Sequence, residues 1–201
     1  MNTVWLPWLG ILVCGIGVLL VNTAVRTIWK LLGLFILFAG GSVMLLTACS
    51  FQTCLALLVC GIGTSVLLGT GNLNRDPAGS SGMEKGNRWF RTILAVIFGL
   101  LSYTLTERIR FWIPVRGSIL FAGVWISMMS LIGLTLDDDL LCRCIYLQCI
   151  CLAFTIVYIY MENSVLVFGF FAAINLMMAF GGSVLSADRS AAVKDSEEER
   201  P

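Results

Sequence analysis

A stretch of 43 residues, Ile145 to Ala187, carries a single charged side chain, Glu162. One crossing of the apolar core of a bilayer takes ~20 helical residues, so this stretch is too long for one crossing and fits two. The step Asn163-Ser164 suits the turn between them. We therefore expect a helical hairpin in which the Glu162 carboxylate lies either at a membrane surface or inside a helix bundle.

The composition agrees with a chain that has the membrane as its solvent. Of 201 residues, 58% are hydrophobic and 12% are charged, whereas a soluble domain carries about 25% charged residues. A span in lipid must satisfy its own backbone hydrogen bonds, so helices are the expected element. The fold class predicted is all-α, a polytopic integral membrane helix bundle. The net charge of +1 argues neither for nor against nucleic acid, and no basic block resembles a nucleic-acid footprint.

Apolar segments mark about seven transmembrane helices. They are Val4–Val21, Trp29–Thr47, Cys54–Thr70, Phe90–Thr106, Ser118–Leu136, Leu141–Tyr160 and Ser164–Ser186. Five of the six tryptophans fall at segment ends, where aromatic rings lie at the level of the lipid headgroups. These five are Trp5, Trp8, Trp29, Trp89 and Trp112.

Basic residues predict the orientation, because cytoplasmic loops carry an excess of Lys and Arg. Ten fall on the side of the membrane away from the N-terminus: Arg26, Lys30, Arg75, Lys85, Arg88, Arg91, Arg143, Arg189, Lys194 and Arg200. Three fall on the other side: Arg108, Arg110 and Arg116. The N-terminus should therefore face out and the C-terminus the cytoplasm.

The chain divides by composition into four parts. Residues 1–70 form a three-helix transmembrane unit, and residues 89–187 form a four-helix unit. Residues 71–88, rich in Gly, Ser, Asn and charge, read as a flexible cytoplasmic linker. Residues 188–201 read as a disordered acidic tail.

Three residues of the terminal hairpin are candidates for an ion path. If Glu162 is buried, desolvation raises its pKa and it can hold or pass a proton, with Asn163 as a hydrogen-bonding neighbour. If it lies in the outer turn, it caps the N-terminus of the next helix, where the helix dipole favours a negative charge. Asn175 lies well inside an apolar span, so it should face another helix, either as interhelical glue or as part of a polar pathway.

Other polar features have plainer interpretations. The acidic run Asp137-Asp138-Asp139 could hold a divalent cation, but it fits better as a water-facing cap at a helix N-terminus. The pattern Cys142, Cys144, Cys149, Cys151 fits no familiar metal site, because residues two apart on a helix point to different faces. With no histidine and no catalytic pair, we expect neither an enzyme nor a bound cofactor or metal.

Two short motifs recur. Leu12–Gly17 (LVCGIG) reappears as Leu58–Gly63, and Phe38–Val43 (FAGGSV) is echoed by Phe180–Val184. They indicate either an internal duplication of the transporter kind or convergent packing, since small residues let helices approach closely.

The segment Tyr158–Val167, followed by Ala172–Leu176, resembles the Glu-Asn hairpin of small multi-span subunits in complex I-like assemblies. These are the seven-helix E-type subunit of energy-converting hydrogenases and its relatives in complex I (subunit K) and the multisubunit Na+/H+ antiporters. The chain also resembles uncharacterised bacterial membrane proteins with this hairpin. By this resemblance Glu162 is the ionisable residue of a lateral ion path and Asn175 a supporting polar one. K-type subunits carry a second buried glutamate on the next helix, and this chain has none there.

These observations give one main functional hypothesis and two alternatives. The first is an accessory subunit of a complex I-like, hydrogenase-like or antiporter-like ion-translocating assembly in the bacterial inner membrane. Its partners would be the lipid bilayer and larger membrane subunits, with the oligomeric state open. The alternatives are a structural or scaffold membrane protein without a transport role, and a small independent transporter.

Overall fold

The computed structural model describes residues 5–46, 48–73, 85–137, 139–162 and 164–198, and the elements in these ranges are seven α-helices. Their bounds are α1 Trp5–Thr23, α2 Thr27–Leu45, α3 Phe51–Leu73, α4 Lys85–Ile109, α5 Gly117–Leu136, α6 Leu140–Glu162 and α7 Val165–Glu198. Each predicted apolar segment corresponds to one of these helices, which confirms the all-helical class and the count of seven over the described residues.

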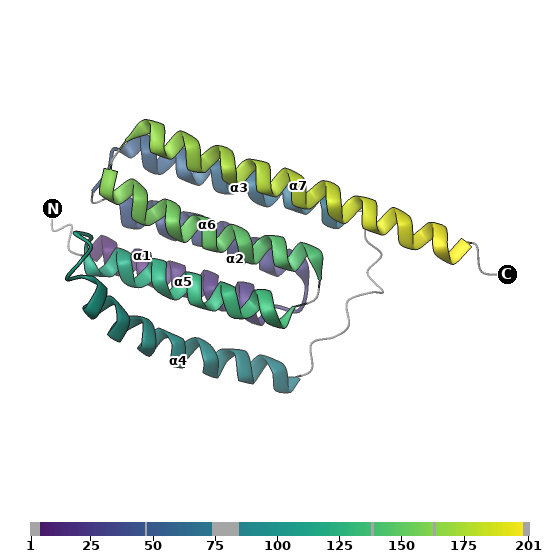
Figure 1. The fold of residues 1–201 in the computed structure, drawn as a ribbon, viewed down its shortest axis with the longest axis horizontal. Helices are drawn as coiled ribbons and strands as arrows, with labels where there is room; N and C mark the ends of the chain where they lie inside the picture. Colours follow the sequence, from purple (N-terminus) through teal and green to yellow (C-terminus); the bar gives the residue numbers. More distant parts are fainter. Residues whose placement is uncertain (1–4, 47, 74–84, 138, 163, 199–201) are drawn as a thin grey trace.

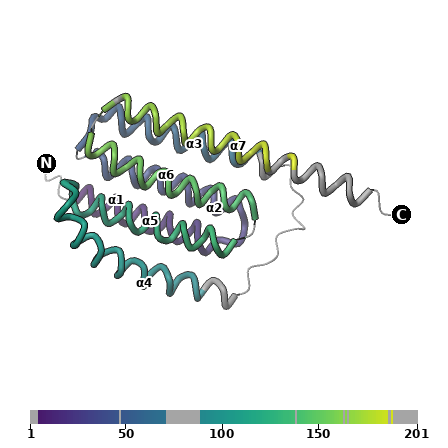
Figure 2. The backbone as a smooth tube through the Cα atoms, in the orientation of Figure 1, coloured from purple at the N-terminus to yellow at the C-terminus, as the bar shows by residue number. Residues whose placement is uncertain are grey.

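The helices form two layers with one helix at the edge (Figure 1). Helices α1, α2 and α3 make one layer, and α5, α6 and α7 make the other, with α1 against α5, α2 against α6 and α3 against α7. Helix α4 lies outside this pair of layers and packs mainly against α5 and α1. The tube view shows successive helices running back and forth along one axis (Figure 2). The predicted three-helix and four-helix units therefore share one packed interior.

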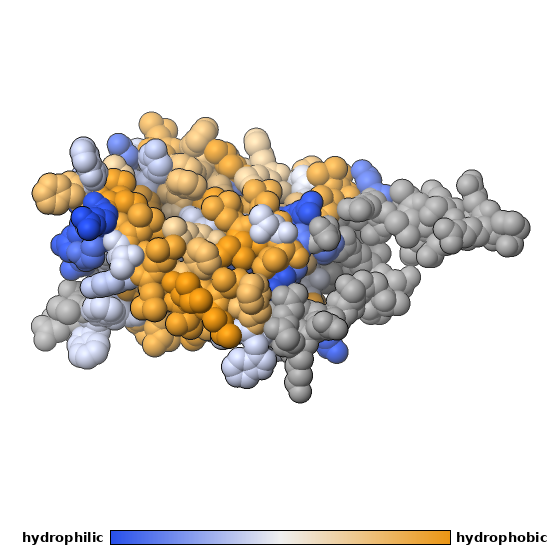
Figure 3. Space-filling model, turned by 60° about the horizontal axis from the view of Figure 1, so that its bottom comes forward, coloured by the Kyte–Doolittle hydropathy of each residue, from blue (hydrophilic) through white to orange (hydrophobic). Residues whose placement is uncertain are grey.

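All seven helices are long and apolar enough to cross a membrane. Much of the outer surface is apolar, and hydrophilic residues gather toward the ends of the bundle (Figure 3). Trp5, Trp29 and Trp89 lie near helix ends with exposed side chains, as an interfacial aromatic belt requires. This distribution reverses that of a soluble protein and is the one expected of a bundle surrounded by lipid.

The two polar segments of the chain are only partly described. Residues 74–84, most of the predicted linker, and 199–201 lie outside the described residues. Helix α7 ends at Glu198, so residues 188–198 are helical where the sequence predicts a disordered tail. The reason is local, because no Gly or Pro follows Gly182 before Pro201 to end the helix.

Helices α1 and α2 approach each other along a seam of four glycines, Gly10, Gly17, Gly33 and Gly40. A Cβ placed on Gly17 would lie 2.9 Å from the carbonyl oxygen of Gly33, and one on Gly33 would lie 2.9 Å from the backbone nitrogen of Val21. Since backbone atoms cannot move aside as a side-chain tip can, only glycine permits this approach.

The recurring motifs also contact neighbouring helices through their glycines. A Cβ on Gly61 of α3 would lie 2.6 Å from Phe38 Cγ of α2, and one on Gly15 of α1 would lie 3.4 Å from the Trp125 ring of α5. The equivalent glycines thus meet unlike partners. This favours convergent small-residue packing over a shared ancestral site as the account of the repeat.

We predict that Gly33→Ala lowers the stability of the bundle by ~1–3 kcal/mol, because the added methyl forces the α1 and α2 backbones apart. Thermal unfolding of the purified protein in mild detergent measures the effect.

Gly181→Ala is the matched control. A Cβ on Gly181 of α7 meets nothing within 4 Å, and alanine is a better helix former than glycine by up to ~1 kcal/mol. The control should match the wild type or exceed it slightly. Equal unfolding temperatures for the two variants would contradict the close approach of α1 and α2.

Candidate functional site

A buried cluster of charged side chains lies at the end of the bundle where α1 and α5 end and α2, α4 and α6 begin. At its centre the Asp137 carboxylate accepts a hydrogen bond from Lys30 Nζ at 2.7 Å and from Arg91 Nη2 at 2.8 Å. The side chains of Lys30 and Arg91 are 3% and 2% exposed, and that of Asp137 is 14% exposed. One carboxylate therefore pairs with two buried cations.

Tyr146 of α6 completes the cluster. Its hydroxyl donates to Asp137 Oδ2 at 2.6 Å and accepts from Arg91 Nη1 at 3.2 Å. Gly133 of α5 makes room for the ring, since a Cβ there would lie 2.5 Å from Tyr146 Cζ. The phenol thus links both charged groups while remaining neutral itself.

Two arginines at this end of the bundle also satisfy helix ends. Arg91 Nη1 donates to the carbonyl oxygen of Asn22, in the last turn of α1, at 3.2 Å. Arg143 Nε donates to the carbonyl oxygen of Asp137, just beyond α5, at 2.9 Å. The last carbonyls of a helix lack intrahelical donors and carry negative partial charge, so cationic side chains stabilise them.

The surroundings of Asp137 decide what it can do chemically. Burial by itself would raise its pKa, but the hydrogen bonds from Arg91, Lys30 and Tyr146 outweigh burial and hold the pKa well below its usual range. The carboxylate is ionised at neutral pH and stays ionised in mild acid. It is suited to joining helices and unsuited to taking up and releasing protons.

The prediction that the acidic run faces water and caps α6 is wrong for Asp137. This residue is the C-cap of α5, turned into the bundle toward two cations. Asp138 lies outside the described residues. The sequence does hold a signal for the cluster, because Lys30 and Arg91 each stand just inside an apolar segment, on the same predicted side as the acidic run.

A second polar group, without charge, joins α6 to α7 in the middle of the bundle. Gln148 Nε2 donates to the backbone oxygen of Asn175 at 2.6 Å. Asn175 Nδ2 donates to the carbonyl oxygen of Phe171 at 2.8 Å and lies 3.5 Å from Thr155 Oγ1. Asn175 thus faces another helix, as the sequence predicts. Gln148 is not among the residues predicted from the sequence, although an amide inside an apolar span is a signal for a helix contact.

The three predicted ion-path residues do not all come together. Glu162 is the last residue of α6 and is exposed. Asn163 lies outside the described residues. Asn175 is 1% exposed and lies well within the apolar part of α7, Leu166–Leu185. The glutamate and the buried amide pair are therefore separate features.

The closely spaced cysteines also separate. Cys142 Sγ lies 3.3 Å from Lys30 Nζ of α2, whereas Cys144 packs against Gly182 of α7. Residues two apart on α6 thus point to different helices, as the helical geometry predicts. Among the described residues no group of His, Cys, Asp and Glu is arranged to hold a metal ion.

Together, seven membrane-length apolar helices and buried charges gathered in one cluster, over the described residues, are the features of a multi-pass membrane protein. Comparison of the chain with protein-family models, with curated proteins and with solved structures finds no match.

We predict that Asp137→Asn destabilises the bundle by ~3–5 kcal/mol, because it leaves buried cations without their counter-charge. A buried lysine can lose its proton, but an arginine cannot, so Arg91 accounts for most of the cost. Thermal or denaturant unfolding in detergent measures it. Glu107→Gln, which removes an exposed carboxylate at the far end of α4, should have little effect.

A double variant tests the cause. Arg91→Met combined with Asp137→Asn removes the unpaired guanidinium and should recover part of the stability lost in Asp137→Asn alone. A double variant as unstable as the sum of the two single variants would show that the pairing described above is not the source of the effect.

Proposed function

We propose that this chain inserts in the bacterial inner membrane as seven spans, with the N-terminus outside and the C-terminus in the cytoplasm. The apolar surface of all seven helices supports insertion. Lys30 and Arg91 are buried in the charge cluster and therefore do not act as loop charges. Without these two, basic residues still favour the C-terminal side, so the orientation rests on the remaining loop and tail residues.

A labelling experiment tests the orientation. Cysteines introduced as Ser80→Cys and Trp112→Cys are treated in intact cells with a maleimide that does not cross membranes. We expect labelling at position 112 and none at position 80 until the cells are opened. The wild type gives the background, since its native cysteines are buried or half-buried where the structure describes them. Labelling at position 80 in intact cells would reverse the orientation.

We further propose that the protein is an accessory subunit of a larger ion-translocating membrane assembly of the complex I-like, hydrogenase-like or antiporter-like kind. The observation that carries this proposal is the position of Glu162, exposed at the end of α6 and separate from both buried polar clusters. A carboxylate at this place can enter an ion path only with groups that a neighbouring subunit supplies. The resemblance of its hairpin to those of such subunits indicates the type of neighbour.

The interior of the described bundle supports a dependent role over independent transport. Asp137 is fixed in an ionised state between two cations, and the Gln148–Asn175 pair is neutral. Neither group is suited to taking up and releasing protons, so neither provides a step for proton transfer across the bundle. The scaffold alternative draws on the same observation, because a locked charge cluster is what a purely structural bundle needs.

Glu162→Gln separates the two functions. We expect the variant to fold and insert normally and to lower coupled proton or Na+ flux when the native assembly is reconstituted in vesicles, because glutamine cannot carry a proton. Flux is compared with the wild type at equal subunit incorporation.

Photo-crosslinking supplies the structural half of the test. A photoreactive residue at position 162 should capture a larger membrane subunit, whereas the same residue at Val96, exposed on α4, is the control for contact with lipid. Unchanged flux together with no captured subunit would favour the scaffold.

A further inference from the structure

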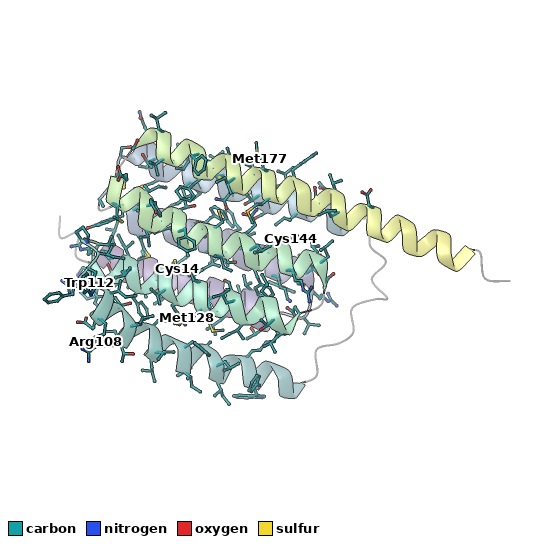
Figure 4. All side chains as sticks on the ribbon, viewed as in Figure 1. Cys14, Arg108, Trp112, Met128, Cys144 and Met177 are labelled. Carbon is teal, nitrogen blue, oxygen red and sulfur yellow. The ribbon has the colours of Figure 1, made fainter. Side chains whose placement is uncertain are left out.

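The turn between α4 and α5, residues 110–116, carries the most exposed aromatic side chains of the described chain. Phe111 is 94% exposed and Trp112 is 86% exposed. They extend from the end of the bundle at which α1 begins, and the sticks of Figure 4 show Trp112 near Arg108 at that end. Two large aromatic rings left almost fully exposed mark an interaction surface.

The turn is nevertheless held in place. Trp112 and Ile113 both donate backbone hydrogen bonds to the carbonyl oxygen of Ile109, at 2.8 and 3.1 Å. Val115, which is 4% exposed, donates to the carbonyl oxygen of Ile113 at 2.8 Å and buries its side chain in the core. The exposed rings therefore project from a fixed base.

Positive charge surrounds these rings. Arg108, Arg110 and Arg116 are all exposed, and the Arg110 side chain lies over the start of α5, 3.8 Å from where Gly117 would carry a Cβ. The first turn of α5 has no acidic residue, and its free N–H groups add positive partial charge. Glu107 is the single acidic residue of α4, Lys85–Ile109. The surface is complementary to anions.

We propose that this aromatic and cationic turn, residues 108–116, binds the headgroups of anionic phospholipids. Phe111 and Trp112 enter the headgroup region, where amphipathic rings are most stable. The three guanidinium groups hold lipid phosphates, whose geometry they match with paired hydrogen bonds. A lipid is favoured over a soluble partner because α4 and α5, the helices that the turn joins, are both apolar enough to cross a membrane, and α4 exposes Leu100 and Leu101.

Lipid binding here gives α4 a second attachment. Helix α4 packs mainly against α5 and α1, and Arg91 ties its first turns to the charge cluster. The turn lies at its other end (Figure 1). Lipids held at the turn fix that end against the bilayer.

Native mass spectrometry of the full chain tests the proposal. The protein is reconstituted with equal amounts of phosphatidylglycerol and phosphatidylcholine, and the bound lipids are counted after gentle release. A variant combining Arg108→Gln, Arg110→Gln and Arg116→Gln is compared with a control combining Arg75→Gln, Lys85→Gln and Arg88→Gln, which removes the same charge from the sequence segment 75–88. Each basic group near an anionic surface contributes about fivefold to binding.

We expect the turn variant to lose at least roughly tenfold of its preference for phosphatidylglycerol and the control to lose distinctly less. Single variants, Arg110→Gln first, should lose about fivefold each, which keeps the test open if the triple variant folds poorly. A turn variant with wild-type preference would overturn the proposal, as would an equal loss in the control. Displacement of phosphatidylglycerol by inorganic phosphate at equal concentration would also overturn it in favour of a site for free anions. None of these outcomes depends on the accessory-subunit function.

Discussion

The pairing of Asp137 with Lys30 and Arg91 is the constraint on which one end of this bundle depends. An arginine cannot shed its charge in a protein, so burying Arg91 demands a permanent counter-charge at hydrogen-bonding distance. Asp137 supplies it, and the carbonyl end of α1 and the Tyr146 hydroxyl accept hydrogen bonds from Nη1, while the buried Nε has no partner among the described residues. Five helices thus meet through a few polar atoms, and the least embedded of them, α4, is the one that contributes the guanidinium.

The polar interior is divided by chemical type. Among the described residues, buried charge is concentrated at one end, where Asp137 pairs with Lys30 and Arg91, while the middle of the bundle holds neutral amides and hydroxyls such as those of Gln148, Asn175 and Thr155. Glu162 stands apart at the opposite end of α6, on the surface. The buried charges of this chain therefore hold helices together. In the proposed accessory role, ion transfer uses the exposed Glu162 carboxylate together with groups of another chain.

Packing in the apolar region relies on shape, because helices in lipid gain no hydrophobic free energy by burying one apolar face against another. The glycines of α1 and α2 bring two backbones into contact, and Trp125 fills the space between α1, α4 and α5 while donating to the carbonyl oxygen of Ala95 at 3.1 Å. Small residues where helices touch and one large ring where they diverge are two answers to the same requirement for dense contact. The exposed aromatic turn after α4 belongs instead to the boundary with the headgroups.

The sequence alone determined the helices and most of their ends, with the exception of α7, which continues to Glu198. The segments Val4–Val21 and Ser118–Leu136 differ by only a few residues from α1, Trp5–Thr23, and α5, Gly117–Leu136. This is possible because a span in lipid satisfies its backbone hydrogen bonds within itself, so its length and composition are local properties. The same reasoning placed Asn175 at a helix contact. The tertiary structure alone decided that Asp137 turns inward. Its partners Lys30 and Arg91 lie 107 and 46 residues away along the chain. The sequence does not show which acidic residue at that end pairs with them. The packing of α1, α2, α4, α5 and α6 decides which acidic residue forms the pair. Hydrogen bonds of 2.6 to 3.2 Å among their side chains and backbones require those five helix ends to lie together.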